Sequence, residues 1–96
     1  MIGLIARWTV PAEHRETVLE ALARMTAAVE ANEPGCLMYH SNISNDDPNV
    51  IVLYERYVDD AALEVHRNAE HFQTIVLGEI VPLLDRRERE FLTPVH

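Results

Sequence analysis

The sequence has a single cysteine, Cys36, and this scarcity excludes two kinds of site. A chain with one cysteine cannot form an internal disulfide, and it cannot assemble a zinc site from several thiolates. A small buried residue is the favoured role of such a cysteine, although a redox-active thiol stays open. Sulfur chemistry is therefore not the function that the composition favours.

Basic residues are also scarce in this chain. Eight Lys and Arg residues stand against sixteen Asp and Glu residues, which gives a formal net charge of −8 and a pI near 4.9. Nucleic acids and anionic membranes are bound by clusters of positive side chains, so neither is an expected partner. The one basic cluster, DRRERE at 85–90, is interleaved with acids and is expected to be a solvated strand or turn.

Long apolar runs and glycine-rich loops are absent as well. The apolar stretch at the N-terminus is too short for a signal peptide, and no segment is long enough to span a bilayer. We therefore expect a cytoplasmic protein. Three glycines do not supply a phosphate-binding loop, and the chain has no G-x-S-x-G nucleophile motif.

The sequence does contain the material for one small globular domain over residues 1–96. Hydrophobic residues make up 48% of the chain and charged residues 25%, which is an ordinary globular composition. Pro11, Asp59 and Pro82 mark the ends of helical patterns. The expected elements are strands at 2–10, 36–44, 50–58 and 86–95, a helix at about 11–32, and a second, two-part helical run at 60–68 and 69–80. This β-α-β-β-α-β order predicts an α+β, ferredoxin-like fold.

The third of these strands is apolar on both of its faces. Val50, Val52 and Val58 alternate with Ile51 and Leu53, whereas a strand with one wet face alternates between apolar and polar residues. Two helices cover only one face of such a sheet, so another surface must cover the second face. We therefore expect a homodimer formed by sheet-on-sheet packing.

Two histidines, His66 and His71 in LEVHRNAEHF at 63–72, are the first candidates for chemistry. Helical residues chelate one ion when they are three or four positions apart, but a spacing of five separates side chains by about 140° around a continuous helix. Only a break near Asn68 would change that geometry. We therefore expect no metal site.

Glu55 offers His66 a different role. Helical spacing places His66 on the inward side of its helix, and strand alternation places Glu55 in an apolar row. Because a buried carboxylate needs a partner, the two can form a pair in which His66 is a general base. Tyr57 and Tyr39 can add hydroxyl groups to the same cavity. Two alternatives stay open. His66 can be a structural core residue that is hydrogen-bonded to a backbone carbonyl, and Glu55 can pair with an arginine in a purely structural role.

The other histidines are weaker candidates. His71 can begin a second helical piece, where a surface or helix-capping role is favoured over catalysis. His40 faces away from Tyr39 if their strand alternates regularly, so it is not placed in the cavity. His14 and His96 are expected to be solvated.

Two stretches, EPGCLMY at 33–39 and LYERYVDDAALEVHRNAEHF at 53–72, resemble the antibiotic biosynthesis monooxygenase (ABM) domain family. The shared pattern is E-x-G-C/N-x-x-Y/F, then a Glu with an aromatic residue two positions on, an Asp-capped helix and H-x4-H-aromatic. The resemblance implies a dimeric α+β barrel of ferredoxin-like subunits. Carried over position by position, the resemblance implies a catalytic set of His66, Glu55 and Tyr57. It also implies a substrate-binding set of Tyr39, Glu33, His71 and Phe72.

Branches of this family catalyse different reactions. The haem-degrading branch uses an Asn on the first strand, a Trp on the second helix and a His further along that helix. The corresponding positions here hold Ala6 or Arg7, His66 and Val76, so haem degradation is not expected. The sequence resembles more closely the quinol monooxygenases and the isomerase of a phosphorylated quorum-sensing autoinducer.

Three hypotheses about function follow from the resemblance and the residues. The leading one is a monooxygenase without flavin, metal or haem that acts on a small quinol or phenolic, polyketide-type substrate, with Glu55 holding the imidazole of His66. The second is an isomerase of a small phosphorylated hydroxyketone that uses the same base, with Arg56, Arg67 and Arg7 as candidate phosphate contacts. The third is a non-catalytic dimer that binds small aromatic ligands.

Overall fold

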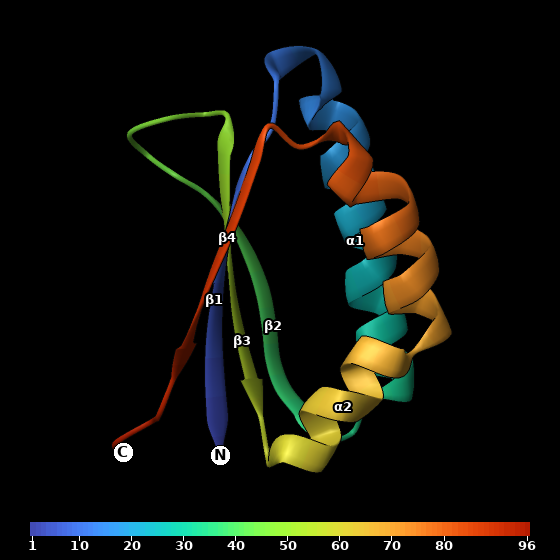
Figure 1. The fold of residues 1–96 in the computed structure, drawn as a ribbon, viewed down its shortest axis with the longest axis vertical. Coiled ribbons are helices and arrows are strands. Elements are labelled where there is room, and N and C mark those ends of the chain that lie inside the picture. The colour runs from blue at the N-terminus through green and yellow to red at the C-terminus, as the bar shows by residue number, and fades with distance from the viewer.

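Four antiparallel strands form one layer of the computed structural model, which describes residues 1–96, and the helices form the other layer (Figure 1). The strands are β1 (Ile2–Thr9), β2 (Cys36–Ile43), β3 (Val50–Tyr57) and β4 (Arg86–Leu92). The helical segments are η1 (Ala12–His14), α1 (Arg15–Asn32), α2 (Asp60–Asn68), η2 (Phe72–Ile80) and η3 (Val81–Leu83). The predicted β-α-β-β-α-β order is confirmed.

The sheet has the strand order β2-β3-β1-β4, with each neighbouring pair antiparallel. Strands β1 and β3 are central, and β2 and β4 are the edges. The hairpin expected between β2 and β3 is present, and its turn is stabilised by Asp47, which accepts hydrogen bonds from the backbone N–H groups of Asn49 and Val50. This topology is that of the ferredoxin-like fold.

The second helical run is broken, as the sequence predicted. Asp59 caps α2 by accepting a hydrogen bond of 2.8 Å from the N–H of Ala62. The run bends at Ala69, whose backbone is extended, before helical structure resumes and continues into the π-helical η2. Pro82 does not end the run directly but lies in the short turn η3, where its missing N–H removes no helical bond. β4 ends at Leu92, three residues earlier than expected.

The hydrophobic core lies between the helices and one face of the sheet. Apolar residues three and four positions apart give α1 one buried stripe, which consists of Val18, Leu22, Met25 and Val29. Ile51 and Leu53 of β3 oppose this stripe and are fully buried. Each such side chain stabilises the fold by roughly 1.5–3 kcal/mol. No helix combines the length and the apolar character needed to cross a bilayer.

The EPG turn at 33–35 brings α2 close to the end of α1. Pro34 disfavours continuation of the helix, so α1 ends at Asn32 and Glu33 takes a non-helical conformation. A side chain at Gly35 would place its Cβ 2.7 Å from the Cβ of Ala62 in α2. Glycine is therefore required at position 35 by close approach, and this approach sets α2 directly above Glu33.

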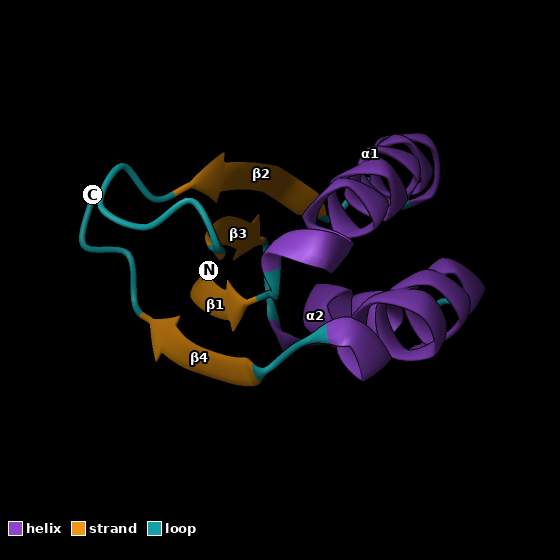
Figure 2. Ribbon diagram, turned by 90° about the horizontal axis from the view of Figure 1, so that it is seen from above, coloured by secondary structure: helices purple, strands orange, loops and turns teal.

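The second face of the sheet is not covered by any helix of the chain (Figure 2). Ile5, Val52 and Tyr54 lie side by side on this face and are only partly buried. Arg56 lies on the same face, and its Nε is buried without a hydrogen-bond partner. An apolar surface with an unpaired guanidinium nitrogen is typical of an interface rather than of a solvated sheet.

We propose that a second copy of the chain covers this face, and we expect a homodimer at micromolar concentration. Sedimentation equilibrium should give twice the chain mass of 11.0 kDa. Val52→Asp should shift the protein to a monomer, because the substitution buries a charge in the proposed interface. Val65→Asp is the matched control, since Val65 is 56% exposed on α2, and it should remain dimeric. A wild-type monomer would contradict the proposal.

Candidate active site

His66 is buried under α2 at the centre of an aromatic cluster. Its side chain faces the sheet, and the residue is only 3% exposed. The rings of Tyr39, Tyr57 and Phe72 surround it, with centroid distances of 5.6, 5.3 and 5.1 Å. The inward orientation predicted from the helical spacing is therefore correct.

A buried carboxylate, that of Glu33, holds the imidazole of His66. The Nδ1 atom of His66 lies 3.0 and 3.1 Å from the two carboxylate oxygens of Glu33, whose side chain is 2% exposed. An ionised carboxylate only accepts hydrogen bonds, so Nδ1 carries the proton in this contact. In a neutral imidazole, the Nε2 atom of His66 then keeps its lone pair free.

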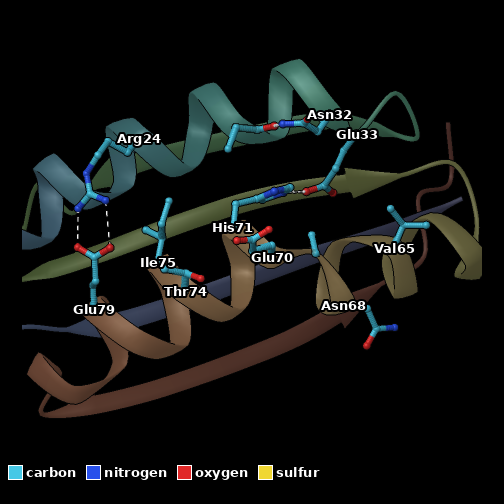
Figure 3. A pocket seen from close by; sticks show the side chains of 12 residues that line it. Arg24, Asn32, Glu33, Val65, Asn68, Glu70, His71, Thr74, Ile75 and Glu79 are labelled. Carbon is cyan, nitrogen blue, oxygen red and sulfur yellow. Dashed lines mark hydrogen bonds and ion pairs between the residues drawn. The ribbon is translucent and has the colours of Figure 1, made fainter.

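The same carboxylate also binds His71, whose Nε2 lies 2.5 Å from Oε2 of Glu33 (Figure 3). On a continuous helix, side chains five positions apart diverge by about 140°. The bend at Ala69 removes this divergence and directs both histidines to one acceptor. His71 immediately precedes η2, as expected, and it lines an open groove, but its side chain binds Glu33 instead of making a capping hydrogen bond.

Glu55 lies on the other side of His66, and it is not the residue that holds the imidazole. Its Oε1 is 3.7 Å from Nε2 of His66, which is too far for a hydrogen bond, and it accepts one of 2.5 Å from the hydroxyl of Tyr57. The expected Glu55–His66 hydrogen bond is therefore corrected to a Glu33–His66 bond. The reason is local: Tyr57 is two positions away on the same strand face and binds the nearer carboxylate oxygen.

Burial governs the protonation of this cluster. It raises the pKa of the Glu55 carboxyl to about 7, an effect that the Tyr57 hydroxyl opposes and the Glu33 charge reinforces. Burial lowers the pKa of His66, and the nearby Glu33 carboxylate offsets part of that shift. Burial also raises the pKa of Tyr57 and of Tyr39, so both hydroxyls stay protonated. Near neutral pH the cluster therefore presents a neutral imidazole beside two hydroxyl donors.

A cavity of about 40 Å³ lies between His66 and the sheet. Four of the predicted site residues line its wall, namely Tyr39, Glu55, His66 and Phe72. The apolar residues that line it are Leu4, Ala6, Trp8, Leu63 and Val76. Arg67, Arg87, Glu88 and Arg89 complete its lining. This volume holds about one or two water molecules, whereas a cavity that binds benzene measures about 150 Å³. An aromatic ligand must therefore widen the cavity as it binds.

A second, larger space lies on the outer side of the helices (Figure 3). This open groove of about 670 Å³ runs between α1 and η2 and is lined by Glu33 and His71. Arg24 and Glu79 cross it with an ion pair of 2.6 Å. No residue lines both the groove and the cavity, so the Glu33 carboxylate stands between two separate spaces.

Three of the predicted site residues, Tyr57, Glu33 and His71, do not line the cavity. Tyr57 reaches the cavity only through Glu55, while Glu33 and His71 lie behind His66 rather than in the cavity wall. His40 is exposed on the uncovered face of the sheet, in register with Tyr54. No group of three or more His, Cys, Asp or Glu side chains has the arrangement of a metal site.

Sequence reasoning missed the arginines of β4. Of the three candidate phosphate contacts, only Arg67 lines the cavity, because Arg7 and Arg56 lie on the uncovered face of the sheet. Arg87 and Arg89 line it instead. Their spacing of two residues was a usable signal, since alternate residues of a strand share one face.

Comparisons with known proteins identify the family to which this fold belongs. The family model for antibiotic biosynthesis monooxygenases matches residues 1–76. A candidate monooxygenase of this kind from Caulobacter crescentus is similar in structure, with a TM-score of 0.93, 27% identity, and coverage of 99% of this chain and 90% of its own. No protein of curated function matches the chain in sequence.

Two further solved structures are similar to this chain. PA3566 from Pseudomonas aeruginosa is 32% identical with a TM-score of 0.86, over 99% of this chain and 94% of its own. Rv0793 from Mycobacterium tuberculosis is 28% identical with a TM-score of 0.89, over 99% of this chain and 95% of its own. With its motifs at 33–39 and 53–72 inside or beside one cavity, the chain belongs to the antibiotic biosynthesis monooxygenase family.

Proposed function

We propose that the protein is a cofactor-independent monooxygenase of a small quinol or phenolic, polyketide-type substrate. Membership of the family supports a monooxygenase-like activity. The observation that carries the proposal is the state of His66, whose Nδ1 is held by a buried carboxylate while Nε2 makes no hydrogen bond beside the cavity. This is the arrangement of a general base.

The first step is removal of a proton from the substrate. Nε2 of His66 accepts the proton from a phenolic hydroxyl or an activated ring carbon, which leaves an electron-rich anion. The imidazolium that forms is stabilised by Glu33 at 3.0 Å, and Glu55 adds a favourable charge when it is ionised. Glu33 also fixes the orientation of the ring, as the carboxylate does in other carboxylate–histidine pairs.

The second step joins the substrate anion to O2. The anion passes one electron to O2, and the two radicals combine to give a peroxide on the ring carbon. His66 returns its proton to the peroxide, which loses water and leaves a carbonyl group on that carbon. One oxygen atom enters the product and the other leaves as water, so the substrate supplies all four electrons. The apolar wall of the cavity keeps bulk water from the peroxide.

A second candidate function is favoured by the arginines at the cavity. An isomerase would use the same base to move a proton between two carbons of a phosphorylated hydroxyketone, with no need for O2. Arg67, Arg87 and Arg89 could bind its phosphate group. Turnover under strict anaerobiosis distinguishes this isomerase from the oxygenase.

The proposed activity predicts O2 uptake with a panel of hydroquinones and anthrones. His66→Gln should lower kcat by about 100-fold or more, because removal of a general base costs about 10²–10⁴ in rate. Oxygen-electrode rates and product mass spectrometry provide the measurement. His14→Gln is the matched control, since His14 lies outside the cavity lining, and it should keep wild-type activity. Full activity of His66→Gln, or no O2 uptake with any substrate, would contradict the proposal.

The raised pKa of Glu55 predicts a pH-dependent effect of Glu55→Gln on stability. Its folded pKa of about 7 exceeds the ordinary value of 4.5, so the unfolded chain releases this proton first as pH rises. The contribution of Glu55 to stability is therefore complete below pH 4.5 and is lost as pH rises toward 7. Relative to wild type, the variant should gain on the order of 2 kcal/mol between pH 5 and pH 8.

Urea unfolding at several pH values measures this difference. Gln keeps an acceptor for the Tyr57 hydroxyl, so the substitution mainly removes the titrating proton. Glu30→Gln, at an exposed position of α1, should show a much smaller change over the same range. A stability difference for Glu55→Gln that is independent of pH would show that the buried carboxyl does not titrate as described.

A further inference from the structure

We propose that the substrate carries a carboxylate, which is bound by Arg67, Arg87 and Arg89 at the cavity. This inference rests on the proposed function, because it narrows the substrate of that site to an acidic quinol or phenol. The three side chains come from two elements, α2 and β4, and all three line the cavity that contains His66. An anion held there would lie beside the base rather than on a distant surface.

The register of the sheet fixes the direction of the β4 arginines. Arg87 pairs with Trp8 and Arg89 pairs with Ala6 across the β1–β4 ladder. Trp8 and Ala6 are buried under the helices and line the cavity, and directly opposed residues of a sheet project from the same face. Both arginines therefore project on the helix side of β4, which is a free edge of the sheet.

The charges of these arginines are unpaired, which is unexpected in so acidic a chain. With 8 basic and 16 acidic residues, most arginines could find a carboxylate, yet neither Arg87 nor Arg89 makes a hydrogen bond or ion pair. The neighbouring Glu88 also lines the cavity, but its carboxylate is bound by Arg86 at 3.2 Å. Two positive groups are thus available to an incoming anion.

Phe91 links the arginines of the two elements. It is the next residue on the same face of β4, and its ring lies 5.5 Å from the guanidinium of Arg67 and 5.4 Å from that of Arg89. Contacts of this kind orient planar guanidinium groups at little entropic cost. Arg67 also bonds Glu64 at 3.1 Å, so its charge is shared, and Arg87 and Arg89 carry more of the proposed binding.

A protective role for the charges of an edge strand is the competing explanation. Charged side chains on an edge strand deter pairing with other chains, and they do so from either face of the strand. In that case Arg86, which lies on the opposite face of β4, would matter as much as Arg87 and Arg89. The two explanations therefore predict different results for substitutions on the two faces.

The test compares acids with their uncharged methyl esters, which have the same ring. The probes are 2,5-dihydroxybenzoate, 2,5-dihydroxyphenylacetate and 3-(2,5-dihydroxyphenyl)propanoate, whose carboxylates extend to different distances. Wild type should prefer at least one acid to its ester by about 10- to 100-fold in kcat/KM, the value of one or two charge-assisted hydrogen bonds. The preference should disappear in Arg87→Ala/Arg89→Ala, persist in Arg86→Ala, and weaken as salt is added.

Binding measured by calorimetry without O2 separates this proposal from the proposed function. The carboxylate site is supported if wild type binds an acid more tightly than its ester and Arg87→Ala/Arg89→Ala does not. This result would support the site even if no probe is oxidised. Equal binding of every acid and its ester, no binding of any acid, or an unchanged preference in the double variant would overturn the proposal. Oxidation of the esters alone would leave the oxygenase standing and remove the carboxylate site.

Discussion

The buried carboxylate of Glu33 is the interaction on which the rest of the site depends. It accepts hydrogen bonds from His66 and His71, and through them it joins the end of α1 to both parts of the second helical run. The Glu33 side chain is only 2% exposed, and a buried carboxylate without partners costs free energy. The hydrogen bonds from the two imidazoles offset that cost. In return the carboxylate fixes the tautomer of the buried imidazole. One charge thus determines helix packing and the chemistry of the base.

Around this carboxylate the molecule has two sides with different properties. On the sheet side a small cavity contains Nε2 of His66, the hydroxyl-bonded carboxyl of Glu55 and an aromatic wall. On the helix side an open groove reaches the same carboxylate through His71. The proposed base is therefore polarised from behind by a charge that does not line the cavity. That separation leaves Nε2 of His66 without a hydrogen-bond partner at the cavity.

The fold could be predicted from sequence because its signals are local. Strand alternation correctly placed Glu55 on the buried face, and helical spacing turned His66 inward. The partner of His66 could not be predicted, since the direction of Glu33 depends on a turn that Pro34 and Gly35 shape jointly with α2. The two-part helical run could be predicted, but the sequence did not show that its bend at Ala69 directs His66 and His71 to one carboxylate. The spacing of Arg87 and Arg89 indicated that they share one face of β4, but assigning that face to the cavity required the sheet register.

The central claim is that Glu33 sets the tautomer of His66, and nitrogen-15 NMR of the imidazole tests it most directly. Near neutral pH the wild-type spectrum should show a neutral ring with Nδ1 protonated and Nε2 unprotonated. In Glu33→Leu no acceptor for the Nδ1 proton remains, so the proton should move to Nε2 and the proposed base should be lost. A wild-type ring protonated at Nε2, or a tautomer unchanged by Glu33→Leu, would contradict the account.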